Sequence, residues 1–184
     1  MQNHTMKCQI VDALFTLMNA QALDTIFVKE IAANAAITRQ TFYRHFKDRY
    51  DVINWFYDQE VESLFIQTQT LDGIQENLIK KSHFYMQHKS HFKNAYSSHG
   101  QNCLRDYEFS TIYRTLAKIV AKKTGCSADN LPPNLSLCIE FFCHGIIGMT
   151  IDWINNDCAM DHVAFSELIV SLMPLQIKSL LDTK

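Results

Sequence analysis

The stretch of residues 28–50, VKEIAANAAITRQTFYRHFKDRY, limits what this chain can fold into more than any other part of it. Its first half places four apolar residues on one face of a helix about two turns long: Val28, Ile31, Ala32 and Ala35. Shortly afterwards, Thr38 can cap a second helix that begins near Arg39, because its hydroxyl can accept a hydrogen bond from a nearby backbone amide. The pattern predicts a helix, a tight turn and a second helix.

The second predicted helix has one apolar face and one polar face. Phe42 and Phe46 are four residues apart and share the side that we expect to be buried. The opposite side carries Arg39, Gln40, Thr41, Tyr43, Arg44 and His45. Side chains of these types can reach DNA.

The charge of this region differs from that of the rest of the chain. Between Ile37 and Tyr50, four basic residues accompany one acid, Asp48, which gives a local charge of +3. Because the whole chain carries −2, the remainder carries −5. A small basic surface on an acidic body suits a protein that meets phosphates with that surface alone.

Residue type divides the expected DNA contacts into two groups. Arg and Gln near the start of a recognition helix read base edges, so Arg39, Gln40 and Thr41 are expected to contact bases. The expected phosphate contacts are Tyr43, His45, Lys47, Arg49, Lys29 and Thr38, with Arg44 as a further DNA contact on the same face.

The segment IAANAAITRQTFYRHFKDRYDVI resembles the DNA-binding signature of the TetR family of bacterial transcription regulators. The residues that fall on the motif are Thr38, Thr41, Phe42, Tyr43, His45, Phe46, Lys47 and Arg49. This resemblance implies a dimer that pairs through its last two long helices. It also implies a small molecule, bound in the C-terminal bundle, that changes the separation of the two recognition helices. The segment FFCHGIIGMTIDWINND is similar to the C-terminal domain of a TetR subgroup with diverse effectors.

Three positions depart from that signature. The family usually has Gly where this chain has Ala36, and at positive φ an alanine costs about 1 kcal/mol. A small residue inside the recognition helix is replaced by Gln40, which can add a base contact. The hydroxyl residue that usually precedes the first helix of the motif is replaced by Phe27, and Thr25 lies two positions earlier. We therefore expect a weakened N-cap and phosphate contact there.

Helical patterns continue along the chain, so the expected fold is all-α. An N-terminal three-helix helix-turn-helix DNA-binding domain is expected in residues 1–48, with its first helix over residues 5–20. A C-terminal helical bundle for ligand sensing and dimerisation is expected in residues 49–184. A fourth, longer helix opens near Asp48 and can transmit movement to the recognition helix. From Gly73 another helix is expected to run towards the segment HFYMQHKSHF.

Two later helices are predicted to form the dimer interface. In the first, spacings of four and three residues make a coiled-coil-like stripe, beside which two glycines permit close helix approach. The expected interface residues are Leu135, Ile139, Phe142, Gly145, Ile146, Gly148, Met149, Trp153, Phe165, Leu168, Ile169 and Leu172. The alternative is that the stripe belongs only to the core of one protomer.

Candidate ligand-binding residues are aromatic and polar groups of the C-terminal part that can equally belong to its core: Tyr85, His88, Tyr113, Phe142 and Trp153. No metal is expected, because only His88 and His91 have the spacing that zinc ligands on one helix need. A metal-sensing regulator is the alternative. The six scattered cysteines form no CxxC pair and are expected to be free thiols, with a redox-sensing cysteine as the alternative.

Composition and the absence of other motifs exclude several classes. A hydrophobic content of 47% with 20% charged residues is typical of a globular protein. The N-terminus has no apolar signal core, and no apolar run is expected to approach the roughly 20 residues that a membrane helix needs. We therefore expect a cytoplasmic protein without membrane contact. Paired Glu-x-x-His segments and the HExxH motif are absent, so we expect no enzymatic activity and no cofactor.

The sequence thus predicts a sequence-specific DNA-binding transcriptional regulator that binds operator DNA as a homodimer. Repression relieved by an unknown small-molecule effector is the expected mode. With about four phosphate-facing residues per subunit, the slope of log affinity against log salt should be about −7. The alternative is a ligand-binding or adaptor protein of the same fold that has lost DNA binding, because Phe27 and Ala36 depart from the motif.

Overall fold

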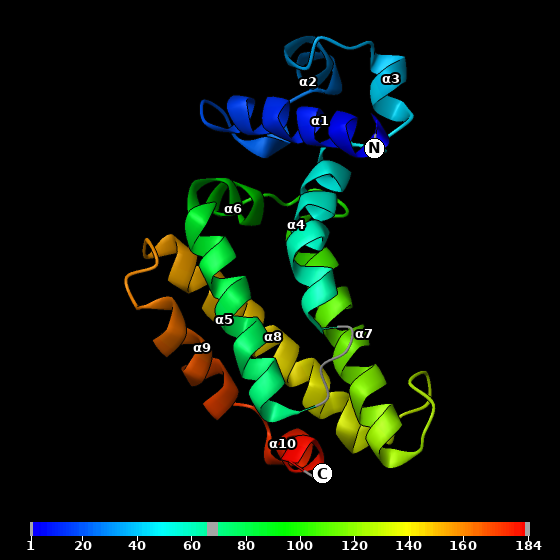
Figure 1. Cartoon of the computed structure of the whole chain (residues 1–184), viewed down its shortest axis with the longest axis vertical. Helices are drawn as coiled ribbons and strands as arrows, with labels where there is room; N and C mark the ends of the chain where they lie inside the picture. The colour runs from blue at the N-terminus through cyan, green and yellow to red at the C-terminus, as the bar shows by residue number, and fades with distance from the viewer. Residues whose placement is uncertain (1, 66–69, 183–184) are drawn as a thin grey trace. The chain divides into compact units, whose positions relative to one another are not determined.

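A computed structural model describes residues 2–65 and 70–182 of the chain. These described residues form ten α-helices and one short 3-10 helix, η1, without a strand, which confirms the all-α prediction (Figure 1). The chain divides into two compact units. The first unit is Met1–Gln59 with Ser90–Leu104, and the second unit is Glu60–Lys89 with Arg105–Lys184.

The boundaries of these units differ from the expected division between residues 48 and 49. The first unit includes the start of α4 (Arg49–Phe65) and, much later in the sequence, residues 90–104. The chain therefore passes between the units three times: within α4, after residue 89 and after residue 104. Periodicity assigns residues to helices but not to units, so the sequence carried no signal for the return of residues 90–104.

The first unit contains the predicted helix-turn-helix motif. Its elements are α1 (Gln2–Met18), η1 (Leu23–Thr25), α2 (Val28–Asn34), α3 (Arg39–Tyr43), the start of α4 and most of α6 (Lys89–Tyr96). Its largest fully buried side chains include Ile10, Leu14, Leu23, Ile26, Ile31 and Phe42. Asp48 caps α4 as predicted, because its Oδ1 accepts a hydrogen bond from Asp51 N at 2.9 Å.

Side-chain hydrogen bonds and ring contacts hold α1 against its neighbours. Gln9 Nε2 donates to Ala35 O at 2.7 Å, and Asn34 Nδ2 donates to Ala13 O at 3.0 Å, so α1 is tied to α2 in both directions. On another side of α1, the ring of Phe15 stacks on that of His91 from α6, with centroids 4.0 Å apart. The expected packing of the first helix over the motif is confirmed.

The second unit is a helical bundle. It contains α5 (Leu71–Gln87), most of α7 (Leu104–Thr124), α8 (Pro133–Asn155), α9 (His162–Ser171) and α10 (Leu175–Asp182). α5 packs against α9, and α8 packs against α10 (Figure 1). α5 begins two residues before Gly73, because the Thr70 hydroxyl accepts a hydrogen bond from Gly73 N at 3.2 Å and caps the helix.

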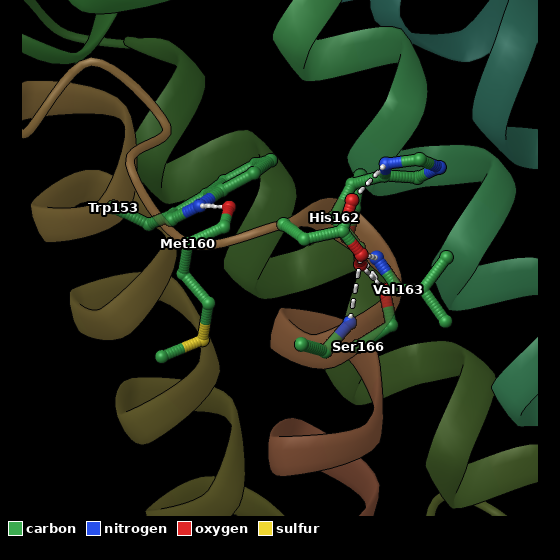
Figure 2. Close-up of polar contacts among 8 residues, drawn as sticks. Trp153, Met160, His162, Val163 and Ser166 are labelled. Carbon is green, nitrogen blue, oxygen red and sulfur yellow. Dashed lines mark hydrogen bonds and ion pairs between the residues drawn. The ribbon is translucent and has the colours of Figure 1, made fainter.

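The connection from α8 to α9 is fixed by side chains from both helices (Figure 2). The indole Nε1 of Trp153 donates to Met160 O at 2.8 Å, and the indole ring stacks on Phe165 with centroids 4.5 Å apart. Ser166 Oγ donates to His162 O at 2.7 Å and lies 2.9 Å from the Oγ of Ser82 in α5, with which it shares a hydrogen bond. These bonds orient α9 against both α8 and α5.

One helix among the described residues is long and apolar enough to span a membrane by length and composition. An 18-residue window of α8 has a mean hydropathy of 1.5, although no apolar run was expected to approach that length. Within the second unit, 44% of this window is buried. A core helix of a folded bundle passes the same test, because it packs many apolar side chains against its neighbours.

Candidate nucleic-acid interface and effector region

Thr38 caps the recognition helix α3 as predicted. Its Oγ1 accepts a hydrogen bond from Thr41 N at 3.0 Å, and its backbone is extended. The turn before it contains Ala36 at φ 51°, in the left-handed region. An alanine there costs about 1 kcal/mol relative to glycine, because its Cβ crowds the backbone.

The start of α2 has only part of an N-cap. Phe27 occupies the cap position and has no side-chain acceptor, although its backbone N donates to Glu30 Oε2 at 2.8 Å. The bond from Phe27 N to the Glu30 carboxylate is one half of a capping box. Thr25 does not replace the missing half, because its hydroxyl donates to Ala22 O at 2.7 Å. The expected weakening of this cap is confirmed.

α3 ends at Tyr43, so Phe46 lies beyond the helix in which it was predicted, but the buried and polar sides of this segment are divided as predicted. Phe42 and Phe46 are buried, with ring centroids 6.1 Å apart. The exposed residues of the motif are Arg39, Gln40, Tyr43, Arg44 and Lys47, while Thr41 and His45 are half-buried. Together with Thr38 and the exposed Lys29 of α2, these residues are called the recognition face below.

Thr41 serves the geometry of the recognition face. Its Oγ1 lies 3.0 Å from Thr38 Oγ1 and accepts a hydrogen bond from Arg44 Nη2 at 3.1 Å. The hydroxyl therefore links the cap of α3 to the guanidinium one turn later. Thr41 was expected to read a base, and its observed partners also allow it to orient Arg44.

Arg49 is directed into the first unit. Its Nη1 donates to Ile26 O at 2.6 Å, its Nη2 donates to Tyr50 Oη at 3.2 Å, and its Nε is buried. The guanidinium also lies over the Tyr50 ring, 5.0 Å from the centroid. We therefore remove Arg49 from the expected phosphate contacts, because its donors already bind groups next to α2.

Two lysines lie against aromatic rings near the recognition face. The ammonium of Lys29 is 5.4 Å from the centroid of the exposed Phe27 ring. The ammonium of Lys7, in α1, is 5.1 Å from the Phe46 centroid and 5.2 Å from the Trp55 centroid. Sequence analysis missed Lys7, because the pattern of α1 indicates only its buried face.

Asp24 is a second residue that sequence analysis missed. Its carboxylate accepts hydrogen bonds from Ser98 Oγ, from Tyr50 Oη at 2.8 Å and from His99 N at 3.2 Å. The bond from Ser98 is the main reason that the pKa of Asp24 lies below its ordinary value. Asp24 is thus ionised at neutral pH and joins three segments of the first unit.

The candidate ligand-binding residues of the second unit have different surroundings. Phe142 and Trp153 are buried in the core. Tyr113 is half-buried, and its Oη lies 2.8 Å from Ser136 Oγ. His88 is half-buried at the C-cap of α5, where burial lowers its pKa despite the opposing effect of Glu60.

Tyr85 belongs to a buried polar cluster. Its Oη donates to Glu108 Oε1 at 2.7 Å, and Lys81 Nζ lies 2.5 Å from the same oxygen. The side chains of Lys81 and Glu108 are 4% and 0% exposed, so this ion pair is almost completely desolvated. Burial raises the pKa of the nearby Cys143 to about 12, although the Lys81 charge opposes the shift. That thiol is protonated at neutral pH and is a poor candidate for redox sensing.

The predicted dimer residues fall into two groups. The large apolar residues of the stripe point into their own protomer: Ile139, Phe142, Ile146, Trp153, Phe165 and Ile169 are buried, and Leu135 and Met149 are half-buried. The exposed members are Gly145, Gly148, Leu168 and Leu172. The buried members of the stripe therefore belong to the core of their own protomer, which is the alternative that the sequence left open.

The exposed face of α8 carries apolar residues that were not predicted as interface. Leu137 and Phe141 are 64% and 77% exposed, and they continue along the helix into Gly145 and Gly148. A Cβ added at either glycine would meet nothing within 4 Å. These four residues are called the outer face of α8 below.

The histidine spacing that kept the metal alternative open is broken in the structure. α5 ends at Gln87, His88 is its C-cap and α6 begins at Lys89, so His88 and His91 do not share one helix. Within residues 2–65 and 70–182, no group of three or more His, Cys, Asp and Glu side chains is arranged to hold a metal ion.

Comparison with known families connects both parts of the chain to one class of protein. Residues 10–54 match the family of bacterial regulatory proteins named tetR, and residues 72–174 match a C-terminal region of transcriptional regulators. The second match alone covers more than half of the chain. The chain belongs to the TetR family of bacterial transcription regulators. It is therefore a DNA-binding transcription regulator with a helix-turn-helix motif.

One curated relative matches part of the chain. The HTH-type dhaKLM operon transcriptional activator DhaS of Lactococcus lactis subsp. lactis (strain IL1403) is 30% identical over 70 residues, which are 38% of this chain. The match spans only 37% of that relative.

Solved structures resemble nearly the whole chain. The dihydroxyacetone kinase operon activator DhaS has a TM-score of 0.63 at 19% identity, covering 95% of this chain and 97% of its own. FadR from Bacillus subtilis, solved with stearoyl-CoA, has a TM-score of 0.60 at 18% identity, covering 90% and 96%. At these identities the likeness shows the fold alone.

Membership in the TetR family also sets expectations that are not specific to this chain. TetR-family regulators bind operator DNA and small-molecule effectors and are usually dimers. They are generally not enzymes, which at the family level agrees with the absence of catalytic motifs in the sequence.

Proposed function

We propose that this TetR-family protein is a cytoplasmic, homodimeric repressor that binds a roughly palindromic operator and is released by a small-molecule effector. The observation that carries the DNA-binding part is the recognition face: a capped helix anchored by two buried phenylalanines, with polar and basic side chains exposed on its other side. Each α3 would enter a major groove, with half-sites about one helical turn apart.

Within the recognition face we assign the two outermost residues at the start of α3, Arg39 and Gln40, to base edges. The proposed phosphate contacts are Lys29, Thr38, Tyr43, Arg44, His45 and Lys47. Thr41 acts through Arg44, because its hydroxyl bonds that guanidinium. Arg49 supports the motif from inside.

We assign the dimer interface to the outer face of α8 together with Leu168 of α9 and Leu172 at the C-cap of α9. Exposed leucine and phenylalanine side chains are costly in water and stabilise an interface when a second copy covers them. Glycines with open space beside them permit close approach of a helix from the second protomer. Symmetry would place each outer face against its own copy.

The effector would bind in the second unit and act by favouring a separation of the recognition helices that does not fit the operator. Tyr85 is the candidate ligand contact that the geometry favours most, because it lies in the buried polar cluster with Lys81 and Glu108. His88, Tyr113, Phe142 and Trp153 complete the candidate set. Such a coupling is reciprocal. Bound effector lowers the affinity for the operator by the same factor by which bound operator lowers the affinity for the effector.

A specific observation also favours a second candidate, a protein of this fold that has lost sequence-specific DNA binding. The N-cap of α2 is incomplete at Phe27 and the turn is strained at Ala36, so the motif is less firmly held than a fully capped one. Such a protein would form a stable dimer without preference for any DNA sequence.

Selection of bound sequences from random DNA duplexes, at two salt concentrations, tests the proposal. Each subunit presents three exposed cations to the phosphates: Lys29, Arg44 and Lys47. A dimer would then neutralise about six phosphates, which gives a slope of log affinity against log salt of about −5. Substitution of the exposed Lys118 in α7 is the matched control and should leave the slope unchanged. Recovery of a palindrome supports the regulator, whereas no enrichment would favour the second candidate.

A further inference from the structure

The connection between α1 and α2, residues 19–27, decides where the helix-turn-helix motif begins relative to α1, yet it contains only the short helix η1. A single side chain from α6 binds it at three points. Asn94 Oδ1 accepts a hydrogen bond from Leu23 N at 2.8 Å, and Asn94 Nδ2 donates to Met18 O and to Gln21 O, both at 2.9 Å. Asn94 thereby joins the end of α1 to the start of η1.

Asp24 binds the same connection to the segment after α6. Its carboxylate accepts hydrogen bonds from Ser98 Oγ and from His99 N. It also accepts the bond from Tyr50 Oη at the start of α4. Hydrogen bonds to an ionised carboxylate are about twice as strong as those between neutral groups. Asp24 is therefore a strong point of attachment between η1, α4 and residues 98–99.

The attachment continues as far as α2. The Tyr50 hydroxyl accepts a hydrogen bond from Arg49 Nη2, and Arg49 Nη1 donates to Ile26 O, two residues before α2 begins. Gly100 allows this arrangement, because a Cβ at that position would overlap the hydroxyl and the ring of Tyr50. A continuous set of hydrogen bonds thus runs from residues 98–99 to the entry of α2.

Residues 90–104 are well placed along the chain to carry a signal. They belong to the first unit, but α5 precedes them and α7 follows them, and both of these helices lie mainly in the second unit. A displacement of α5 or α7 is therefore transmitted to residues 90–104 through the covalent chain at both ends. α4 is the third such connection.

We infer that Asn94 and Asp24 are positioning residues through which the segment 90–104 sets the position of the helix-turn-helix motif. In this arrangement, regulation reaches the motif through the α1–α2 connection as well as through α4. The inference rests on the proposed function only for its effect on DNA, since the attachment of the two segments is a property of the free protein.

Amide hydrogen exchange and DNA affinity together test the inference. We expect Asn94→Ala, Asp24→Asn and the milder Ser98→Ala to increase exchange at residues 18–38. We also expect them to weaken binding to a duplex selected by the unsubstituted protein by about 5- to 150-fold, with the same base preference, because the binding-competent position becomes less populated. His99→Ala is the matched control, because only its backbone N–H is used and its side chain is exposed.

Three results would overturn the inference: unchanged exchange in residues 18–38, increased exchange with unchanged DNA affinity, or a control variant that behaves like the others. Far-UV circular dichroism identifies a variant that fails to fold. Ser98→Ala then provides the measurement, because it removes only the bonds of one hydroxyl, the one to Asp24 and the long one from Gly100 N at 3.5 Å. Failure of the unsubstituted protein to select any duplex would overturn the proposed function instead, while the exchange measurement still tests the attachment.

Discussion

The strained turn before the recognition helix permits a sharp test of how this sequence holds its motif. Ala36 has φ 51°, which costs an L-residue about 1–2 kcal/mol and costs glycine almost nothing. Glycine at this position also makes the unfolded chain more flexible, which offsets about 0.4–1 kcal/mol of the gain. We therefore expect Ala36→Gly to raise the free energy of unfolding by about 0.5–1 kcal/mol.

The matched control lies three residues earlier. Ala33 is exposed like Ala36, but it lies inside α2 and its carbonyl accepts a hydrogen bond from Ala36 N at 3.1 Å. Ala33→Gly should therefore lower the free energy of unfolding by about 1 kcal/mol, the ordinary helix cost of glycine. The same chemical change should have opposite signs at two neighbouring exposed sites.

Urea unfolding at one fixed protein concentration measures both changes, because the stability of a dimer depends on concentration. A shift of 1 kcal/mol corresponds to about 2–4 °C in Tm for a chain of this size. Operator affinity should stay within about twofold in Ala36→Gly, because the recognition face is unaltered. Destabilisation by Ala36→Gly, or the same sign for both variants, would refute the argument from backbone strain.

Three further predictions address the recognition face, the outer face of α8 and the buried ion pair. Gln40→Ala should reduce discrimination at one base pair by about 1–3 kcal/mol, whereas Lys47→Ala should weaken binding to all duplexes alike. Binding titrations with base-pair variants of the duplex measure both effects. A change of base preference in Lys47→Ala would contradict our division of roles. Phe141→Glu should shift the protein from dimer to monomer in analytical ultracentrifugation while the helical content is retained, and an unchanged dimer would place the interface elsewhere. Glu108→Gln should destabilise the second unit by about 3–5 kcal/mol in denaturant titrations, because the buried Lys81 ammonium would lose its carboxylate partner. The double replacement of Lys81→Met with Glu108→Leu should cost much less stability. Equal losses of stability in both variants would argue against this electrostatic cause.

Local features of the motif could be predicted from sequence because their causes act within four residues. The cap at Thr38 depends on an amide three positions later, and the burial of Phe42 depends on helical spacing, whereas Phe46 is buried just beyond the end of α3. The positive φ at Ala36 was expected only from the family signature, since an alanine by itself gives no sign of it.

Features that depend on distant partners could not be predicted. Arg49 was expected on phosphates because it is basic and close to the recognition helix, but its partner Ile26 O lies 23 residues earlier. Asn94 and Asp24 are separated by 70 residues and have no motif in common. Short polar side chains that bind backbone groups across a fold carry no periodic signal, so only the structure connects them.

The buried stripe of α8 was assigned to the interface for a different physical reason. This helix is apolar on two sides, and spacing alone indicates which residues share a side but not which side meets the protomer's own core. Side-chain volume distinguishes the two sides. The large side chains of Ile139, Phe142 and Ile146 can fill a core, whereas a core face that contained Gly145 and Gly148 would leave voids. In a helix with two apolar sides, the side with glycines is therefore the better candidate for contact with a second protomer, and Phe141→Glu tests that rule directly.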